Sequence, residues 1–232
     1  MPTVVVLLPA RNEEEGIGEV IDRIPITDIS EQGYETIVVV ADGNSEDKTR
    51  EIARERGAIV IEQKGPVGKG NGVREALEHI FNSEEIASEL VIMLDSDATY
   101  RPEDLPRFIE KLQVSDVVWG SRLRGNMEKN AMSRVNRIGN IILSLSASIV
   151  YFTRTTDLCT GYWGFRSKAL RKLDLIAEGF SLEADLFASV SKSKLKTDEI
   201  AIDYAHREGQ SSLTWYLDGP RILMMVIKRR FY

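Results

Sequence analysis

Short apolar segments alternate with amphipathic ones along the first half of the chain, and this alternation restricts the fold more strongly than any other feature. The amphipathic segments carry apolar residues at helical spacing, as at Ile17, Val20, Ile21 and Ile24. Continuous apolar strands that alternate with helices predict an α/β fold, with a parallel sheet covered by helices on both faces. The expected strands are residues 3–8, 36–40, 58–61, 90–94 and 114–119, and the expected helices are residues 13–24, 45–56, 102–112 and one that ends near residue 81.

The second half of the chain is less regular. We expect helices over residues 129–152, 180–192 and 213–227, and strands over residues 160–167 and 197–204. The sequence contains no internal repeat, low-complexity tract or linker, so a single domain over residues 1–232 is the simplest organisation.

The composition excludes some classes of function. The formal net charge of −6 argues against non-specific nucleic-acid binding, which requires a basic face. Cys159 is the only cysteine, so no intrachain disulfide can form, and a cytoplasmic location is expected. The longest mostly apolar run, residues 138–152, is shorter than the roughly 20 residues of a membrane span. We expect no transmembrane helix, although such a segment can lie in a membrane interface.

Two carboxylates directly follow the expected strand at residues 90–94. Asp95 and Asp97 are two positions apart, so in extended backbone they point to the same side and would repel each other without a cation between them. Carboxylate oxygens suit Mg²⁺ or Mn²⁺, which usually also bind substrate phosphates. This D-x-D pattern is common in proteins, but its place at the carboxyl end of a central strand favours a metal site.

A glycine-rich loop, residues 65–72, follows the third expected strand and precedes a helix. Glycines allow a backbone to approach a phosphate or a sugar closely, and a helix N-terminus favours anions. The loop is not a Walker A motif, because Lys69 is followed by Gly70 rather than by Ser or Thr. Lys69 and Gly70 are therefore candidates for substrate binding, with a flexible turn as the alternative.

The other expected strands also end in polar residues. Asp42 can accept a hydrogen bond from a base or a ribose, or cap the next helix, for which Ser45 is the expected N-cap. Arg122 offers bidentate contacts to phosphate. Arg11 and Glu13 follow the first strand. In parallel sheets, ligands bind at the carboxyl ends of the strands, so these side chains are expected in one site.

Nine short motifs in order make the chain resemble glycosyltransferase family 2, which has the inverting GT-A fold with a mainly parallel, mixed sheet. Within that family it looks like the polyprenyl-phosphate (dolichyl-phosphate) mannose and glucose synthases. The resemblance covers residues 2–215. The motifs are residues 9–13 (PARNE), 42–45 (DGNS), 68–71 (GKGN), 95–97 (DSD), 120–122 (GSR), 136–140 (NRIGN), 160–166 (TGYWGFR), 179–183 (GFSLE) and 207–211 (REGQS).

The resemblance also implies roles for individual residues. Pro9, Arg11 and Glu13 would line the nucleoside pocket, and Asp42 would contact the base. Asp95 and Asp97, with Ser96 between them, would hold the metal and the diphosphate. Three arginines would bind the donor diphosphate or the acceptor phosphate: Arg122, Arg137 and Arg207. Two departures from the family pattern are Ala41, where many relatives have a second acid, and Ser212, where many have a lysine.

The implied reaction is metal-dependent and inverting, from a nucleotide sugar to a polyprenyl phosphate. Residues 1–122 would bind the donor, and residues 123–232 the acceptor. An acceptor phosphate needs no general base, whereas a sugar hydroxyl needs one, for which Glu183 or Asp185 are candidates. The alternatives are a soluble family-2 enzyme with a sugar or small hydroxyl acceptor, and a catalytically silent binding or scaffold protein.

A lipid acceptor implies a membrane surface. Residues 129–152 and 214–232 could lie in the interface as apolar helices, which makes a peripheral protein on the cytoplasmic face the expectation. In the alternative, both helices only complete the core. The sugar, the nucleotide (UDP or GDP) and the oligomeric state stay open.

Overall fold

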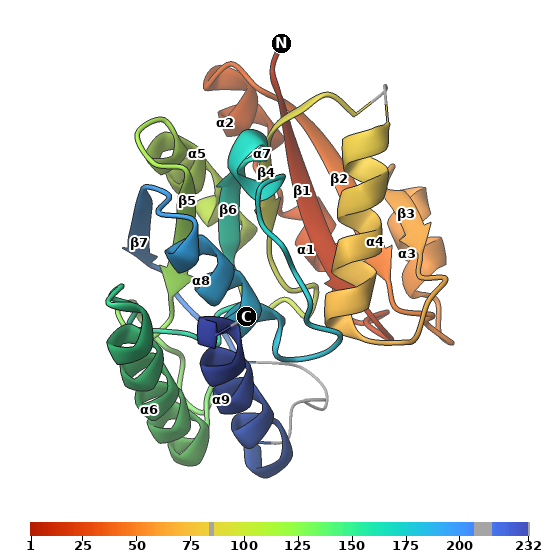
Figure 1. The fold of residues 1–232 in the computed structure, drawn as a ribbon. Coiled ribbons are helices and arrows are strands. Elements are labelled where there is room, and N and C mark those ends of the chain that lie inside the picture. The colour runs from red at the N-terminus through yellow and green to blue at the C-terminus, as the bar shows by residue number, and fades with distance from the viewer. Residues whose placement is uncertain (84–85, 207–214, 232) are drawn as a thin grey trace.

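The computed structural model of the chain describes residues 1–83, 86–206 and 215–231. Within these residues, seven strands form one sheet in the order β3-β2-β1-β4-β6-β5-β7 (Figure 1). The strands are β1 (Thr3–Ala10), β2 (Glu35–Asp42), β3 (Ile59–Glu62), β4 (Ser88–Met93), β5 (Val117–Ser121), β6 (Trp163–Arg166) and β7 (Thr197–Ala201). The helices are α1 (Ile17–Asp22), α2 (Ile26–Glu31), α3 (Thr49–Glu55), α4 (Lys69–Asn82), the 3₁₀ turn η1 (Pro102–Asp104), α5 (Leu105–Leu112), α6 (Arg134–Tyr151), α7 (Ser167–Leu170), α8 (Leu182–Lys192) and α9 (Trp215–Phe231).

One strand of this sheet, β6, runs against the others. It lies antiparallel to both β4 and β5, while the remaining neighbours pair in parallel. The parallel strands end at one edge of the sheet, and β6 begins at that same edge. Residues 160–162, which lead into β6, are therefore brought next to the segments that follow β4 and β5.

The sheet is covered on both faces because alternate side chains of its central strands point to opposite sides. In β1, Val5 and Leu7 pack in a core with α4 and α8, whereas Val4, Val6 and Leu8 pack in a second core with α1, α2 and α5. The predicted α/β sheet with helices on both faces is confirmed.

Two local predictions are wrong. The expected helix at residues 13–24 is shorter and is followed by a separate helix, with Pro25 between α1 and α2; proline has no N–H to continue a helix. Ser45 is not the N-cap of α3, which begins at Thr49 without a side-chain cap. The Ser45 hydroxyl instead accepts the backbone N–H of Asn12 at 3.0 Å and so ties together the loops after β1 and β2.

The helices α6 and α9 lie side by side away from the centre of the sheet (Figure 1). The Tyr151 hydroxyl at the end of α6 donates to the carbonyl of Val226 in α9 at 2.9 Å. Each helix exposes an apolar stripe at helical spacing. The stripes are Ile138, Ile142, Leu145 and Ile149 on α6, and Met224, Ile227 and Phe231 on α9. Among the described residues, no helix has the length and apolar character needed to cross a bilayer.

Candidate active site

A cavity of about 1170 Å³ lies at the edge where the parallel strands end. It brings together loops from β1, β2, β4 and β5 with residues of α4, α6, α8 and α9. The predicted site residues that line it are Pro9, Arg11, Glu13, Lys69, Asp95, Ser96, Asp97, Arg122 and Glu183. Segments far apart in the sequence therefore meet in one cavity.

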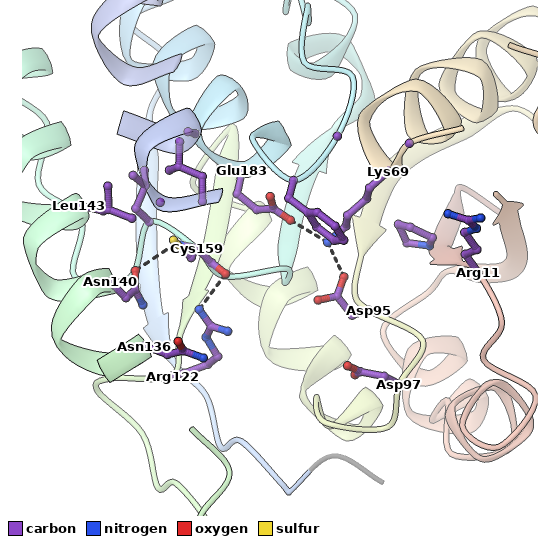
Figure 2. A pocket seen from close by; sticks show the side chains of 18 of the residues that line it. Arg11, Lys69, Asp95, Asp97, Arg122, Asn136, Asn140, Leu143, Cys159 and Glu183 are labelled. Atoms are coloured by element: carbon purple, nitrogen blue, oxygen red, sulfur yellow. Dashed lines mark hydrogen bonds and ion pairs between the residues drawn. The ribbon is translucent and has the colours of Figure 1, made fainter. Parts of the chain in front are cut away.

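One lysine connects two carboxylates in the floor of this cavity. The Lys69 ammonium lies 2.6 Å from Oδ1 of Asp95 and 2.7 Å from Oε1 of Glu183 (Figure 2). Burial lowers the pKa of Lys69, but the charges of Asp95 and Glu183 outweigh burial and hold that pKa above its ordinary value. Lys69 thus stays charged and couples the loop after β4 to the first turn of α8.

The second carboxylate of the D-x-D motif is oriented by its own loop. Asp97 accepts hydrogen bonds from the backbone N–H of Thr99 at 3.2 Å and from the Thr99 hydroxyl at 2.6 Å. Between the two acids, the buried Ser96 hydroxyl donates to the carbonyl of Pro9 at 2.7 Å. These bonds anchor the loop after β4 to the end of β1, with both acids lining the cavity (Figure 2).

The donor atoms at this loop fit a metal that is shared with a substrate. In residues 1–83, 86–206 and 215–231, no group of three or more His, Cys, Asp or Glu side chains could hold a metal by itself. Lys69 contacts only one oxygen of Asp95. Mg²⁺ is usually bound by one or two carboxylates, and phosphate oxygens and water complete its coordination. Asp95 and Asp97 have the chemistry of such a partial ligand set.

Gly161 allows the Asp95 carboxylate to sit against the chain that leads into β6. A Cβ atom on Gly161 would lie 2.6 Å from Cγ and 2.8 Å from Oδ1 of Asp95. The Gly161 N–H also donates to the hydroxyl of Tyr100 at 2.8 Å. Any larger residue at this position would displace the carboxylate.

The glycines at the start of α4 have a packing role. A Cβ atom on Gly68 or Gly70 would collide with the backbone carbonyl of Glu178 or Ala177, respectively, and the Asn71 N–H donates to the carbonyl of Glu178 at 3.1 Å. These two glycines therefore let the loop approach another part of the protein backbone, where we had expected a phosphate or a sugar. Gly70 does not line the cavity, and its part in substrate binding stays a prediction.

Arg122 is held in place by a network that the sequence did not indicate. Its Nε and Nη2 lie 2.8 and 2.7 Å from the two oxygens of Asp157, and Nη2 also donates to the carbonyl of Cys159 at 2.7 Å. Its guanidinium carbon lies 5.9 and 5.1 Å from the ring centres of Tyr100 and Tyr204. Burial lowers the pKa of Arg122, but Asp157 outweighs this effect and raises it.

Asp157 was missed because it follows α6 in an irregular segment with no motif of its own. It also accepts a hydrogen bond from Nδ2 of Asn140 at 2.6 Å, which joins α6 to Arg122. Asn140 lies in the NRIGN motif, and its polarity within an apolar helix was the signal that could have revealed it. Burial raises the pKa of the neighbouring Cys159 thiol to about 12, so this cysteine is a neutral thiol at pH 7.

Asp42 and Arg137 do not line the cavity. Asp42 is fully buried, accepts the N–H of Ser45 at 3.1 Å and does not line the cavity, although its neighbours Ala41 and Gly43 do. Arg137 is exposed on α6. Arg207 lies outside the residues that the structure describes.

Asp185 is not available as a general base. It is fully buried, and its Oδ1 lies 2.7 Å from Nε of Arg229. Its Oδ2 accepts the N–H groups of Ile176 and Ala177 at 2.6 and 2.8 Å. Of the two acids considered for that role, only Glu183 lines the cavity.

The cavity changes in character from one end to the other. Asp95, Asp97 and Lys69 lie toward β1 and β4, whereas apolar side chains line the part between α6 and α9 (Figure 2). Those apolar residues are Ile142, Leu143, Pro220, Ile222 and Leu223. One cavity thus offers a charged end and an apolar end.

Known proteins share this sequence and this fold. The chain is 33% identical over 235 residues to glycosyltransferase AglJ of Haloferax volcanii. This alignment covers 99% of this chain and 73% of that protein. It is also 33% identical over 229 residues to the dolichyl-phosphate hexose transferase of Haloferax volcanii, over 97% of this chain and 92% of that protein.

A crystal structure of glucosyl-3-phosphoglycerate synthase from Mycobacterium tuberculosis, in complex with Mn²⁺, UDP and phosphoglyceric acid, has a similar fold. Its TM-score is 0.75 at 19% identity, over 99% of this chain and 79% of that one. The fold is thus the GT-A fold. Residues 5–174 match the family model described as Glycosyl transferase family 2. With that match and the similarity to AglJ, the predicted family is confirmed, and the chain belongs to glycosyltransferase family 2.

Proposed function

We propose that this glycosyltransferase moves a sugar from a nucleoside diphosphate to the phosphate of a polyprenyl lipid at a membrane surface. The observation that carries the proposal is the cavity, whose charged end at Asp95 continues into an apolar end between α6 and α9. A donor diphosphate suits the first end, and a lipid chain suits the second. The name of the dolichyl-phosphate hexose transferase, 33% identical, supports this acceptor class.

The donor would lie across the ends of β1, β2 and β4. Pro9 and Arg11 would border the nucleoside, and Lys69 would place its positive charge beside the diphosphate. Asp95 and Asp97 would hold Mg²⁺ or Mn²⁺, which supplies neutralisation of the charge on the leaving diphosphate.

The acceptor phosphate would lie near Arg122 and Asn136, which border the cavity between its two ends. An oxygen of this phosphate forms a bond with the anomeric carbon while the bond from that carbon to the diphosphate breaks. The bonding electrons leave with the nucleoside diphosphate, and the configuration inverts. A phosphate monoester has its second pKa near ~6, so the acceptor is largely dianionic at pH 7 and needs no general base.

The membrane surface would be met by α6 and α9. Their exposed stripes include Ile149, with 72% of its surface accessible, and Met224, with 65%. α6 contains two arginines and no acid, and α9 exposes Arg221, Lys228 and Arg230, in a chain of net charge −6. Apolar stripes flanked by basic residues suit a surface that contains anionic lipids. Assignment to the cytoplasmic face stays a prediction.

The activity is tested with a panel of UDP- and GDP-sugars and polyprenyl phosphate, with Mg²⁺, Mn²⁺ or a chelator. We expect one donor to give a labelled product in the organic phase, and Asp95→Asn and Asp97→Asn to abolish it. Asp22→Asn, at a surface acid ion-paired with Arg56, is the matched control. Transfer to a water-soluble acceptor alone would refute the acceptor class, and full turnover with chelator would refute the metal.

Membrane contact is tested by flotation with liposomes that contain anionic lipids. Ile149→Glu and Met224→Glu should reduce the floated fraction, because each places a charge in an apolar stripe. Val114→Glu is the control, since Val114 is 60% exposed on the loop between α5 and β5. Equal flotation of all three variants would contradict the proposed orientation.

A further inference from the structure

Two helical glycines line the cavity, although the packing of the protein does not require a residue without a side chain at either position. A Cβ atom on Gly139 of α6, or on Gly219 of α9, would meet no other atom within 4 Å. Neither residue has a left-handed backbone conformation. They differ in this from Gly161, where an added Cβ would strike the carboxylate of Asp95.

Glycine at position 139 is unfavourable for the free protein. Within a helix, glycine destabilises relative to alanine because its backbone loses more conformational freedom on folding. Alanine at Gly139 would fit without a clash and would strengthen α6. The glycine is therefore better explained by a molecule that must pass close to the α6 backbone than by the stability of the helix.

The position of Gly139 indicates which molecule this is. On the cavity side of α6, the polar Asn136 lies one turn before Gly139, and the apolar Ile142 and Leu143 lie one turn after it. Gly139 thus marks the junction between the polar and the apolar part of the cavity. A polyprenyl phosphate also changes from polar to apolar at one point, where its phosphate is attached to the first branched isoprene unit.

On the basis of the proposed function, we infer that Gly139 determines acceptor specificity, together with Gly219 on the neighbouring helix α9. They keep the cavity wide enough, between α6 and α9, for the first isoprene units next to the acceptor phosphate. The donor binds at the other end of the cavity and does not depend on them. A small soluble acceptor would not require this width.

Gly139 gives the sharper test of the two. Gly219 precedes Pro220, and a residue with a Cβ atom before proline is disfavoured in a helix, so a change there would alter the backbone as well. At Gly139, alanine and leucine both have higher helix propensity than glycine and add one methyl or a full side chain to the cavity. Ser146→Ala, on α6 outside the cavity lining, is the control.

The experiment measures thermal unfolding, UDP and GDP binding, and transfer to polyprenyl phosphate in the full chain. For Gly139→Ala we expect Tm to rise by about 1–4 °C. For Gly139→Leu we expect kcat/KM for the lipid acceptor to fall at least about tenfold, because the acceptor is displaced from its productive position. Gly139→Ala should show a smaller loss of the same kind. Nucleotide affinity should stay within about twofold of wild type, and Ser146→Ala should keep full activity.

A variant that is more stable yet less active on the lipid cannot be explained by damage to the fold. Wild-type transfer rates in both Gly139 variants would overturn the inference and leave the proposed function intact. Equal losses of nucleotide binding and transfer would also overturn it, since Gly139 would then act on the donor. A wild-type enzyme that fails with polyprenyl phosphate would instead refute the proposed function.

Discussion

Replacement of Arg229 by methionine should destabilise the protein through Asp185. Both side chains are buried, with 5% and 0% of their surfaces exposed, and they form an ion pair at 2.7 Å. Breaking a buried pair costs about 3–5 kcal/mol, since one charge remains uncompensated. Asp185 keeps two backbone N–H donors, so we expect the lower end of this range, about 3 kcal/mol, or a Tm lower by about 6–12 °C.

The replacement of Arg229 should also affect the candidate active site. Asp185 holds the N–H of Ala177, and the carbonyl of Ala177 packs against Gly70 in the first turn of α4. That turn begins at Lys69, which pairs with Asp95. We therefore expect KM for the sugar donor to rise in Arg229→Met at a temperature where the variant is fully folded.

Urea unfolding and steady-state kinetics check both parts. Arg230→Met is the control, because Arg230 is exposed and its replacement should change stability by no more than about 0.5 kcal/mol. The double variant with Asp185→Asn should lose less than the sum of the two single losses, by at least about 1 kcal/mol. Strictly additive losses, or an unchanged donor KM, would refute this reasoning.

Three further predictions concern the cavity itself. Gly161→Ala should lower kcat/KM at least about tenfold in a transfer assay, because its Cβ displaces the carboxylate of Asp95. Arg122→Lys should lower both Tm and kcat in paired melting and kinetic measurements, because lysine cannot reproduce the bidentate contact to Asp157. Glu183→Gln should reduce turnover by less than about tenfold with a phosphate acceptor; a loss of ~10²–10⁴-fold would identify Glu183 as a general base and a hydroxyl as the acceptor.

The repeating part of the fold could be predicted from local patterns. β1 to β5 are short apolar runs, and the period of the side chains between them predicted the helices. The antiparallel direction of β6 could not be predicted in this way. The direction of a strand depends on which distant strands it pairs with, and the side-chain pattern of four residues does not contain that information. The expected helix ended at Ile24, before Pro25, but the short helix α2 after this proline was not predicted.

The site was predictable where function requires a particular residue type at a strand end. Asp95, Asp97 and Arg122 follow strands directly, and the structure places all three in the cavity. Asp157 and Tyr100 were missed because their contacts with Arg122 arise only when distant loops meet. Asp42 also stands at a strand end, yet its carboxylate is turned into its own loop.

The insertion of β6 between β4 and β5 determines which parts of this enzyme can be exchanged with those of a relative. A chimera joined at residue 122 would take β6 and β7 from another sequence and would pair them with unrelated strand edges. By contrast, α6 and α9 contribute no strand to the sheet. Under the proposed function, an exchange of the cavity-lining residues of these two helices would alter the acceptor end. Asn140 and Arg229 would have to be kept, because they hold Asp157 and Asp185 in place.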